Sequence, residues 1–384
     1  MTTVRTVLRT GFHDLFYPAA GNIPALDVLR SLAILLVFTM HFAHWNHASP
    51  RVDNFPVVNL GWTGVDLFFV LSGLLIGRQL WKELKQTGGI RIPRFLVRRG
   101  LRIWPLYFSF VALATITEIW GKQPIRTYYD AVFLSNYFDG GVGGAWSLST
   151  EEQFYILAPV MLALFALVFR PKQIWIAPVI GIALLVVSRA LTIRYSGLTG
   201  YDLNQKLVYA FHTDADGLAV GLLLAWLSIF QAKRIAHPRF AALLAAAMLF
   251  VGAGLYVSSR LLFNFTAIGL LYGALVLYGI SPLPLPRIFK WRGFYLISRL
   301  SFGIYLNHFV ILSLVDPWID TWRSQHGELG FWAWYLGAFA LCLLTAAVTF
   351  MLIEWPFLYL RSQLLESKPF KMSGAIERPE VVLP

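Results

Sequence analysis

Cysteine and charge are both scarce in this chain. Cysteine occurs once, as Cys342, among 384 residues, which excludes an internal disulfide framework and a metal site built from cysteines. Charged residues make up 14% of the sequence and hydrophobic residues 57%, a balance that excludes a soluble globule of this length. We find no internal repeat, no low-complexity tract and no cleavable signal peptide, so the first apolar segment is expected to act as the insertion signal.

Long apolar runs recur along the sequence instead. We predict an all-α fold, a polytopic transmembrane helical bundle of about ten spans. The transmembrane domain is expected over residues 26–360, after an N-terminal segment 1–25 and before a tail 361–384 that is rich in proline and charge and expected to be disordered. The expected spans are 26–45, 61–80, 101–120, 152–169, 174–192, 215–231, 239–257, 261–280, 295–315 and 331–358.

Basic residues alternate from loop to loop. Lysine and arginine number 32 against 20 acidic residues, for a net charge of +12. With a cytoplasmic N-terminus, the inner segments hold roughly three times as many basic residues as the outer loops. This bias predicts an even number of spans, cytoplasmic N- and C-termini, and a place in the inner or plasma membrane. Topology and anionic membrane lipids explain the charge without nucleic acid, since no nucleic-acid motif accompanies it.

The first apolar segment carries two ionisable residues, Arg30 and His41. Eleven residues return a helix to nearly the same face, so both side chains share one face and lie about 16 Å apart along the axis. An ionisable group inside a membrane span costs roughly 3 kcal/mol or more, which makes both residues candidates for function. The alternative is an arginine that snorkels near a helix end and a histidine at the interface.

A second group, residues 146–152, lies where an outer loop enters the predicted fourth span. Ser147 or Ser149 could cap this helix, with the acidic pair that follows in its first turn. On the predicted topology Glu151 also lies at the depth of His41. A carboxylate and an imidazole at equal depth form the base and orienting acid that remove a proton from a hydroxyl.

A third group consists of arginines at the inner mouth of the predicted third span. Five arginines fall within the twelve residues 91–102. Guanidinium groups suit phosphate oxygens, so the pattern favours a polyphosphate ligand that approaches from the cytoplasm. Lipid headgroups are the alternative partner. The residues that follow Arg91 in this group are Arg94, Arg98, Arg99 and Arg102.

The segment Gly61–Gly73 opens the predicted second span. Its small residues, which include Gly64 and Ser72, permit close approach of another helix. Asp66 is a second candidate for a buried carboxylate, although it could simply cap the helix or pair with a cation. Packing therefore explains the glycines, and the role of the carboxylate stays open.

Two further segments hold histidines. His212, Asp214 and Asp216 near the sixth span could suggest a metal. The pattern is weak and no other ligand cluster accompanies it, so we expect no metal. Tyr305 and His308, three residues apart, share one face of the ninth span. The histidine there could be a hydrogen-bonded core group or a catalyst.

Together these segments resemble the acyltransferase-3 family of integral membrane O-acyltransferases, which includes enzymes that acetylate bacterial surface polysaccharides and lipid-linked glycans. The likeness extends from about residue 24 to 357. One departure is that Asp214 stands two residues before Asp216, where a basic residue is expected. The matching blocks, in order, are Arg30 with His41, Gly61–Gly73, Arg94–Tyr107, Trp146–Tyr155, Asp216 with Gly221, and Ser301–His308.

The resemblance implies an acyl-CoA donor on the cytoplasmic side, with acetyl expected, and a hydroxyl acceptor on an extracytoplasmic glycan or lipid-linked sugar. It implies His41 as the catalytic residue, Glu151 as the matching acid and no bound cofactor. Arg30 and the inner arginines would contact the CoA phosphates. Supporting or acceptor-side residues would be Asp66, Ser72, Trp146, Ser147, Ser149, Asp216, Tyr305 and His308.

Two other classes of protein remain possible from the residues alone. Arginine, histidine and carboxylates inside a membrane also mark the ion or substrate pathway of a secondary transporter. Against this reading, no paired hydropathy halves appear, and the arginine group at residues 91–102 has no evident transport role. A membrane-embedded assembly subunit would explain the hydrophobicity but not the clustered ionisable groups.

Overall fold

The computed structural model describes residues 4–19, 21–45 and 55–365, and within these residues the chain is helical, with no β-strand. The first half contains α1 (Val4–Phe16), α2 (Pro24–Trp45), α4 (Pro56–Asn59), η1 (Gly61–Thr63), α5 (Gly64–Thr87), α6 (Ile92–Trp120), α7 (Thr127–Ala131) and α8 (Ala145–Ala166). The second half contains α9 (Ile176–Tyr195), α10 (Gly200–Tyr209), α11 (Phe211–Asp214), α12 (Asp216–Phe230), α13 (Ala232–Ile235), α14 (Pro238–Ser258), α15 (Arg260–Ile280), η2 (Arg287–Lys290), α16 (Arg292–Thr349), η3 (Phe350–Glu354) and α17 (Trp355–Leu365).

Eight helical segments of the described chain are long and apolar enough to cross a membrane. The predicted spans 152–169 and 215–231 fall on α8 and α12, which are not among the eight. Helix α8 begins earlier than predicted, at Ala145, and its polar first turns lower its mean hydropathy. Helix α12 has 15 residues, about 22 Å of helix against a hydrocarbon core of roughly 30 Å.

Helix α5 is the centre of the bundle and packs closely on α12. A Cβ atom added at Gly73 would lie 2.2 Å from the carbonyl oxygen of Leu218, and one added at Gly221 would lie 2.2 Å from that of Val70. Only glycine allows two backbones to approach this closely. The packing role predicted for the small residues of the segment Gly61–Gly73 is therefore confirmed at Gly73.

Helix α16 is helical over 58 residues, yet it folds back on itself. The Asn307 side chain donates a hydrogen bond to the carbonyl oxygen of Cys342 at 3.1 Å, across 35 residues of sequence. A straight helix would separate these residues by about 50 Å. The two arms therefore correspond to the predicted spans 295–315 and 331–358, and Cys342 is a buried core residue.

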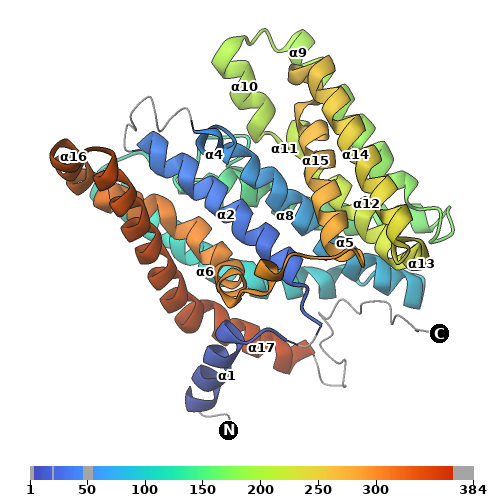
Figure 1. Cartoon of the computed structure of the whole chain (residues 1–384), viewed down its shortest axis with the longest axis horizontal. Coiled ribbons are helices and arrows are strands. Elements are labelled where there is room, and N and C mark those ends of the chain that lie inside the picture. The colour runs from blue at the N-terminus through green and yellow to red at the C-terminus, as the bar shows by residue number, and fades with distance from the viewer. Residues whose placement is uncertain (1–3, 20, 46–54, 366–384) are drawn as a thin grey trace.

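The two ends of the bundle differ in the elements they carry. Trp355 in α17 donates a hydrogen bond from Nε1 to the carbonyl oxygen of Val7 in α1, at 2.7 Å. Figure 1 shows α1 and α17 together at one end and α10 at the opposite end. We call the end formed by α1, α17 and the start of α6 the basic end, and the end formed by α10 and α11 the distal end.

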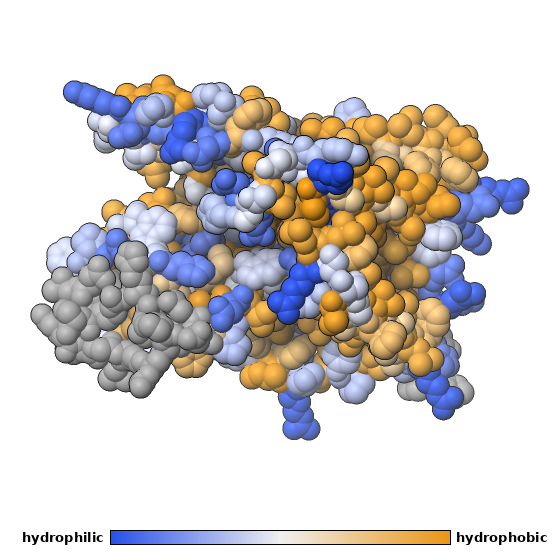
Figure 2. Space-filling view, turned by 90° about the horizontal axis from the view of Figure 1, so that it is seen from above, coloured by the Kyte–Doolittle hydropathy of each residue, from blue (hydrophilic) through white to orange (hydrophobic). Residues whose placement is uncertain are grey.

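Apolar side chains cover the outside of the bundle. On α14, Phe250 is 83% exposed and Val257 is 84% exposed. Figure 2 shows a broad hydrophobic surface on the side of the molecule where α14 lies. Such a surface is stable only against lipid, so the chain is a multi-pass membrane protein. The N-terminal segment contains α1, and residues 366–384 of the predicted tail lie outside the described residues.

Candidate active site

His41 in α2 pairs with His308 in the first arm of α16. The Nδ1 atom of His41 lies 3.1 Å from Nε2 of His308. His308 is fully buried, whereas His41 is half-buried and its ring also contacts Phe309, with ring centroids 4.6 Å apart. Two helices that are distant in sequence thus meet at one imidazole pair, toward the distal end.

The hydrogen bonds of His308 determine which nitrogen of each ring carries a proton. Nδ1 of His308 lies 2.6 Å from the carbonyl oxygen of Tyr305, and a carbonyl can only accept, so this nitrogen bears the hydrogen. Complete burial favours a neutral ring, whose Nε2 then accepts from Nδ1–H of His41. The remaining nitrogen of His41, Nε2, therefore carries a lone pair and can accept a proton.

Tyr305 and Ser147 fix the start of α8 against α16. The two hydroxyl oxygens lie 2.5 Å apart, and both hydroxyls reach the carbonyl oxygen of Gly144, at 3.0 Å from Tyr305 and 3.1 Å from Ser147. Each hydroxyl has a single proton, and this closed set of contacts uses both. The arrangement positions α8 rather than presenting a hydroxyl to substrate.

The expected pairing of Glu151 with His41 is not formed. The carboxylate of Glu151 accepts a hydrogen bond from the Tyr155 hydroxyl at 2.7 Å, and Tyr155 also contacts the Ser72 hydroxyl at 3.0 Å. Because α8 begins at Ala145, Glu151 lies about 9 Å inside the helix instead of at its mouth. It interacts electrostatically with arginines of the basic end instead.

The capping alternative for residues 146–152 is also wrong. The N-cap of α8 is Gly144, without a side-chain hydrogen bond. Ser149 is fully buried and its hydroxyl lies 2.8 Å from that of Ser135. Trp146 is half-buried and packs on Tyr209 of α10, with ring centroids 4.9 Å apart. Trp146 is therefore the member of this group that lies closest to the surface of the distal end.

Arginines from four helices gather near the basic end. Arg102 of α6 is within electrostatic range of Arg30 on α2, Arg99, Arg299 on α16 and Arg361 on α17. Two of the predicted arginines lie farther out, since Arg94 is exposed and Arg98 is half-buried. Besides Arg30 and the arginines of residues 91–102, which the sequence had grouped together, this cluster thus includes Arg299 and Arg361.

Three of these guanidinium groups have unused hydrogen-bond donors. Within the described residues, Arg30, Arg99 and Arg102 form no hydrogen bond and no ion pair at contact distance, although Arg99 stacks over the Tyr155 ring at 5.5 Å. Arginine is rarely left in this state inside a protein unless an anion completes the site. The geometry suits a ligand with several negatively charged oxygens.

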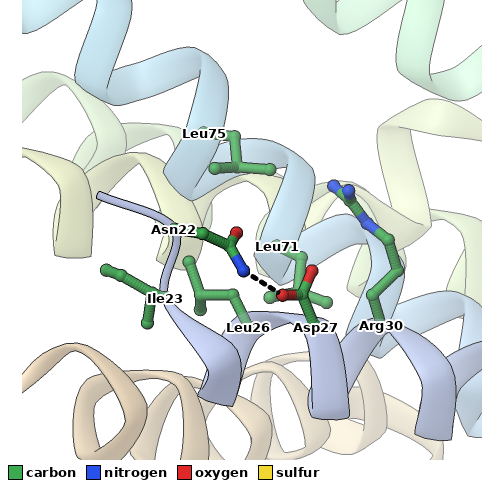
Figure 3. A pocket seen from close by; sticks show the side chains of 7 residues that line it. All are labelled: Asn22, Ile23, Leu26, Asp27, Arg30, Leu71 and Leu75. Atoms are coloured by element: carbon green, nitrogen blue, oxygen red, sulfur yellow. Dashed lines mark hydrogen bonds between the residues drawn. The ribbon is translucent and has the colours of Figure 1, made fainter. Parts of the chain in front are cut away.

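A cavity of about 90 Å³ opens beside Arg30. Figure 3 shows Asp27 and Arg30 side by side on α2, with residues of α5 across the cavity. Asp27 accepts hydrogen bonds from Asn22 at 2.6 Å and from Ser298 at 2.9 Å, so its charge is partly engaged. The cavity is lined by Asn22, Ile23, Leu26, Asp27, Arg30, Leu71 and Leu75.

Asp216 forms a buried ion pair with Arg189 of α9. Two contacts, at 2.6 and 3.0 Å, join the guanidinium to the carboxylate, and both side chains are fully buried. Arg189 also donates to Thr266 of α15 at 2.7 Å. The basic partner that the resemblance placed two residues before Asp216 is therefore supplied by another helix, and the pair ties α9, α12 and α15 together.

Two other acidic residues lie in electrostatic range of this ion pair. Asp66 and Asp214 are both buried, each with one carboxylate oxygen that has no partner among the described residues. His212 points elsewhere, with Nδ1 3.0 Å from the Tyr137 hydroxyl. The histidine and Asp216 thus have separate partners and do not converge on one position.

Sequence reasoning missed Arg299 and Tyr155. Tyr155 follows Glu151 by four residues, a spacing that places both on one helical face and could have been recognised. Arg299 precedes His308 by nine residues, which places it on the opposite face of the same helix. A helical pattern therefore gave no reason to group Arg299 with the site.

Comparison with known proteins identifies the family to which the chain belongs. The described residues form a membrane-embedded helical bundle with a histidine pair at one depth and a group of arginines at another. A model of the acyltransferase domain matches residues 23–353, so the chain belongs to the acyltransferase-3 family. The family resemblance found in the sequence is thereby confirmed. No solved structure matches the chain.

Curated relatives carry related names. The peptidoglycan O-acetyltransferase of Listeria monocytogenes is 27% identical over 92% of this chain and 56% of its own length. A Bacillus subtilis protein provisionally named a peptidoglycan O-acetyltransferase is 27% identical over 87% of this chain and 54% of its own. A Staphylococcus aureus protein provisionally named an O-acetyltransferase is 25% identical over 89% of this chain and 58% of its own length. The chain thus spans little more than half the length of these relatives.

Proposed function

We propose that this protein is a membrane O-acyltransferase that moves an acyl group, expected to be acetyl, from cytoplasmic acyl-CoA to a hydroxyl of an extracytoplasmic glycan or lipid-linked sugar. The observation that carries the proposal is the imidazole pair of His41 and His308, which leaves His41 Nε2 as a proton acceptor. Membership of the acyltransferase-3 family supports acyl transfer over the transporter alternative.

In the proposed reaction, Nε2 of His41 removes the proton from the acceptor hydroxyl while the hydroxyl oxygen attacks the thioester carbonyl carbon. A C–O bond forms and the C–S bond breaks. The proton then passes from the His41 imidazolium to the departing thiolate, so atoms and charges balance. His308 holds the His41 ring and stabilises its positive charge through Nε2. An acyl intermediate on His41 or a serine is the alternative route.

The acyl donor is proposed to bind at the basic end. Arg30, Arg99 and Arg102 have guanidinium hydrogens available for the phosphate oxygens of CoA. Arg30 and His41 are separated by about 16 Å along α2, which is on the scale of an extended pantetheine arm. The proposal requires this arm to pass through the bundle, with Glu151 and Tyr155 near its entrance.

The orientation follows from the distribution of charge. The basic end is proposed to be cytoplasmic, with both termini on that side and the distal end outside the inner or plasma membrane. The short helix α12 and the polar α8 would complete a total of about ten crossing segments, buried among longer helices. Helix α8 carries Glu151 and Tyr155, and α12 packs on α5; a membrane protein tolerates short or polar segments where other helices bury them.

The acceptor is proposed to be a cell-wall glycan, because two of the relatives are named for peptidoglycan. Trp146 and Tyr209 lie at the distal end with their rings in contact, and aromatic rings of this kind suit the apolar face of a sugar. On the proposed orientation these rings lie on the side where the glycan would approach.

The proposal can be tested in proteoliposomes that contain the full chain, with labelled acetyl-CoA on the side of the basic end and soluble peptidoglycan fragments on the other. Wild-type protein is expected to label the fragments. His41→Ala should lower the rate about 10²- to 10⁴-fold, the range for a general base. His44→Ala, which removes an exposed histidine of the same helix, is the matched control and should leave the rate unchanged.

Two outcomes would contradict the proposed function. The first is full transfer by His41→Ala at normal membrane abundance. The second is uptake of a solute without acylation of the fragments, which would favour a transporter. Acyl label that stays on the protein after denaturation, and is lost in His41→Ala, would instead assign the route through an acyl intermediate.

A further inference from the structure

The N-terminal helix α1 places a carboxylate on an arginine of the basic end. Asp14 accepts a hydrogen bond from Nε of Arg299 at 2.7 Å and a second from Nη2. The Arg299 side chain is 16% exposed and that of Asp14 is 31% exposed. This contact is therefore close to solvent at the mouth of the bundle, and either partner is within reach of a soluble ligand.

Arg299 also belongs to the group of arginines around Arg102. Of the charged groups around Arg102, it has the largest electrostatic effect on that residue, and it also acts on Arg30. Other carboxylates in this region are Asp27 and Glu354, which both interact with Arg299 at longer range. Among the described carboxylates, only Asp14 contacts this guanidinium directly. The Phe350 ring also lies against it, with the ring centroid 4.8 Å from the guanidinium carbon.

Helix α1 has other anchors that do not involve the Asp14 carboxylate. Trp355 donates to the carbonyl oxygen of Val7 at 2.7 Å, and the Tyr295 hydroxyl donates to the backbone oxygen of Asp14 at 2.6 Å. Gly11 lies against the Trp355 ring, where an added Cβ would come within 2.6 Å of it. The helix can therefore stay docked when the side chain of Asp14 releases Arg299.

We propose that Arg299 is a further phosphate ligand for the acyl donor, and that Asp14 occupies its guanidinium until a phosphate-bearing ligand displaces the carboxylate. The inference rests on the proposed acyl-CoA donor. In the structure Nε and Nη2 of Arg299 both donate to Oδ2 of Asp14, and an incoming phosphate offers these two donors several oxygen acceptors with more negative charge. The acyl donor thus has to displace the Asp14 carboxylate before it can bind Arg299, and this competition lowers the affinity for the donor.

The size of this effect on donor affinity follows from the exposure of the Asp14–Arg299 ion pair. Ion pairs close to solvent contribute little to stability, so release of Asp14 should change donor affinity only about twofold to fivefold. Loss of Arg299 removes a charge-assisted contact with the phosphate and should weaken binding about tenfold. Since both effects act through one guanidinium, they should not add.

The test measures binding of CoA and of inorganic pyrophosphate to the purified full chain by calorimetry, without an acceptor. Asp14→Asn should bind both ligands about twofold to fivefold more tightly. Arg299→Gln should bind both about tenfold more weakly, and the double variant should match Arg299→Gln. Asp139→Asn is the matched control, because it breaks an ion pair with Arg126 far from the basic end, and it should change neither affinity.

The outcomes separate this inference from the proposed function. If pyrophosphate responds as expected but CoA does not bind, the proposed donor is wrong and the role of Asp14 stands. If CoA binds and Asp14→Asn leaves its affinity unchanged or weaker, Asp14 is only an anchor for α1 and the inference fails. Unchanged affinity in Arg299→Gln overturns it independently, and so does the absence of binding of either ligand to the wild type.

Discussion

Replacement of His308 tests whether His41 depends on its imidazole partner. In the resting protein the contact at 3.1 Å joins two neutral rings, and such a hydrogen bond contributes about 0.5–1.5 kcal/mol. When His41 takes a proton, the same contact becomes a bond from a charged donor, worth about 1.5–3 kcal/mol. Only the difference, about 1–1.5 kcal/mol, acts on the rate.

His308→Ala should therefore lower kcat about 5- to 13-fold by loss of charge stabilisation alone. Loss of the fixed tautomer adds to this, so we expect a total decrease of about 10- to 30-fold, smaller than that of His41→Ala. The KM for acetyl-CoA should not change, because the proposed phosphate ligands lie at the basic end. Release of the free CoA thiol, followed with saturating acetyl-CoA and peptidoglycan fragments, measures both constants.

His308→Gln provides the control for packing. A glutamine side chain fills part of the space and carries an amide oxygen that can accept from Nδ1–H of His41. It should recover part of the lost rate, which a purely structural role of His308 would not explain. A kcat for His308→Ala within twofold of the wild type, with the variant folded, would refute the assignment of the proton to Nδ1 of His41.

Three further predictions concern other parts of the bundle. Gly73→Ala should destabilise the protein by about 1–3 kcal/mol, seen as a lower thermal midpoint, because its Cβ would meet the Leu218 backbone; Gly181→Ala, with open space around it, should not. Arg189→Met should lower the free energy of unfolding by about 3–5 kcal/mol, because it leaves Asp216 unpaired. Adding Asp216→Leu should restore most of the thermal midpoint, and a double variant no more stable than Arg189→Met would contradict this. Arg102→Gln should raise the KM for acetyl-CoA about tenfold with little change in kcat. Arg94→Gln, at an exposed position, is the comparison and should raise this KM less; equal effects of the two variants would place the donor elsewhere.

Helical periodicity gave the local part of this structure. The helix around Arg30 and His41 and the close packing of Gly73 both follow from spacing and side-chain size, which act within a few residues. The position of Glu151 was wrong for a local reason as well. A polar run was taken to lie outside the helix, whereas tertiary burial of Ser147 and Ser149 extends α8 toward the distal end.

The contacts between helices could not be derived in the same way. His308 pairs with a histidine 267 residues away, and nothing in either segment specifies that partner. The partners of Arg299 and Arg189 were equally out of reach of sequence reasoning, since the two carboxylates lie on α1 and α12. A single sequence records which side chains need a partner inside a membrane but not which helix supplies it.

The ion pair between Arg189 and Asp216 also has a consequence for biogenesis. Arg189 is synthesised 27 residues before Asp216, so α9 enters the bilayer as a largely apolar segment with a guanidinium that has no partner yet. That state costs roughly 2.5–3.5 kcal/mol on insertion scales. Nascent α9 is therefore less stable in the membrane until α12 emerges. Because α12 is translated later, its Asp216 is the group that completes the stable insertion of α9.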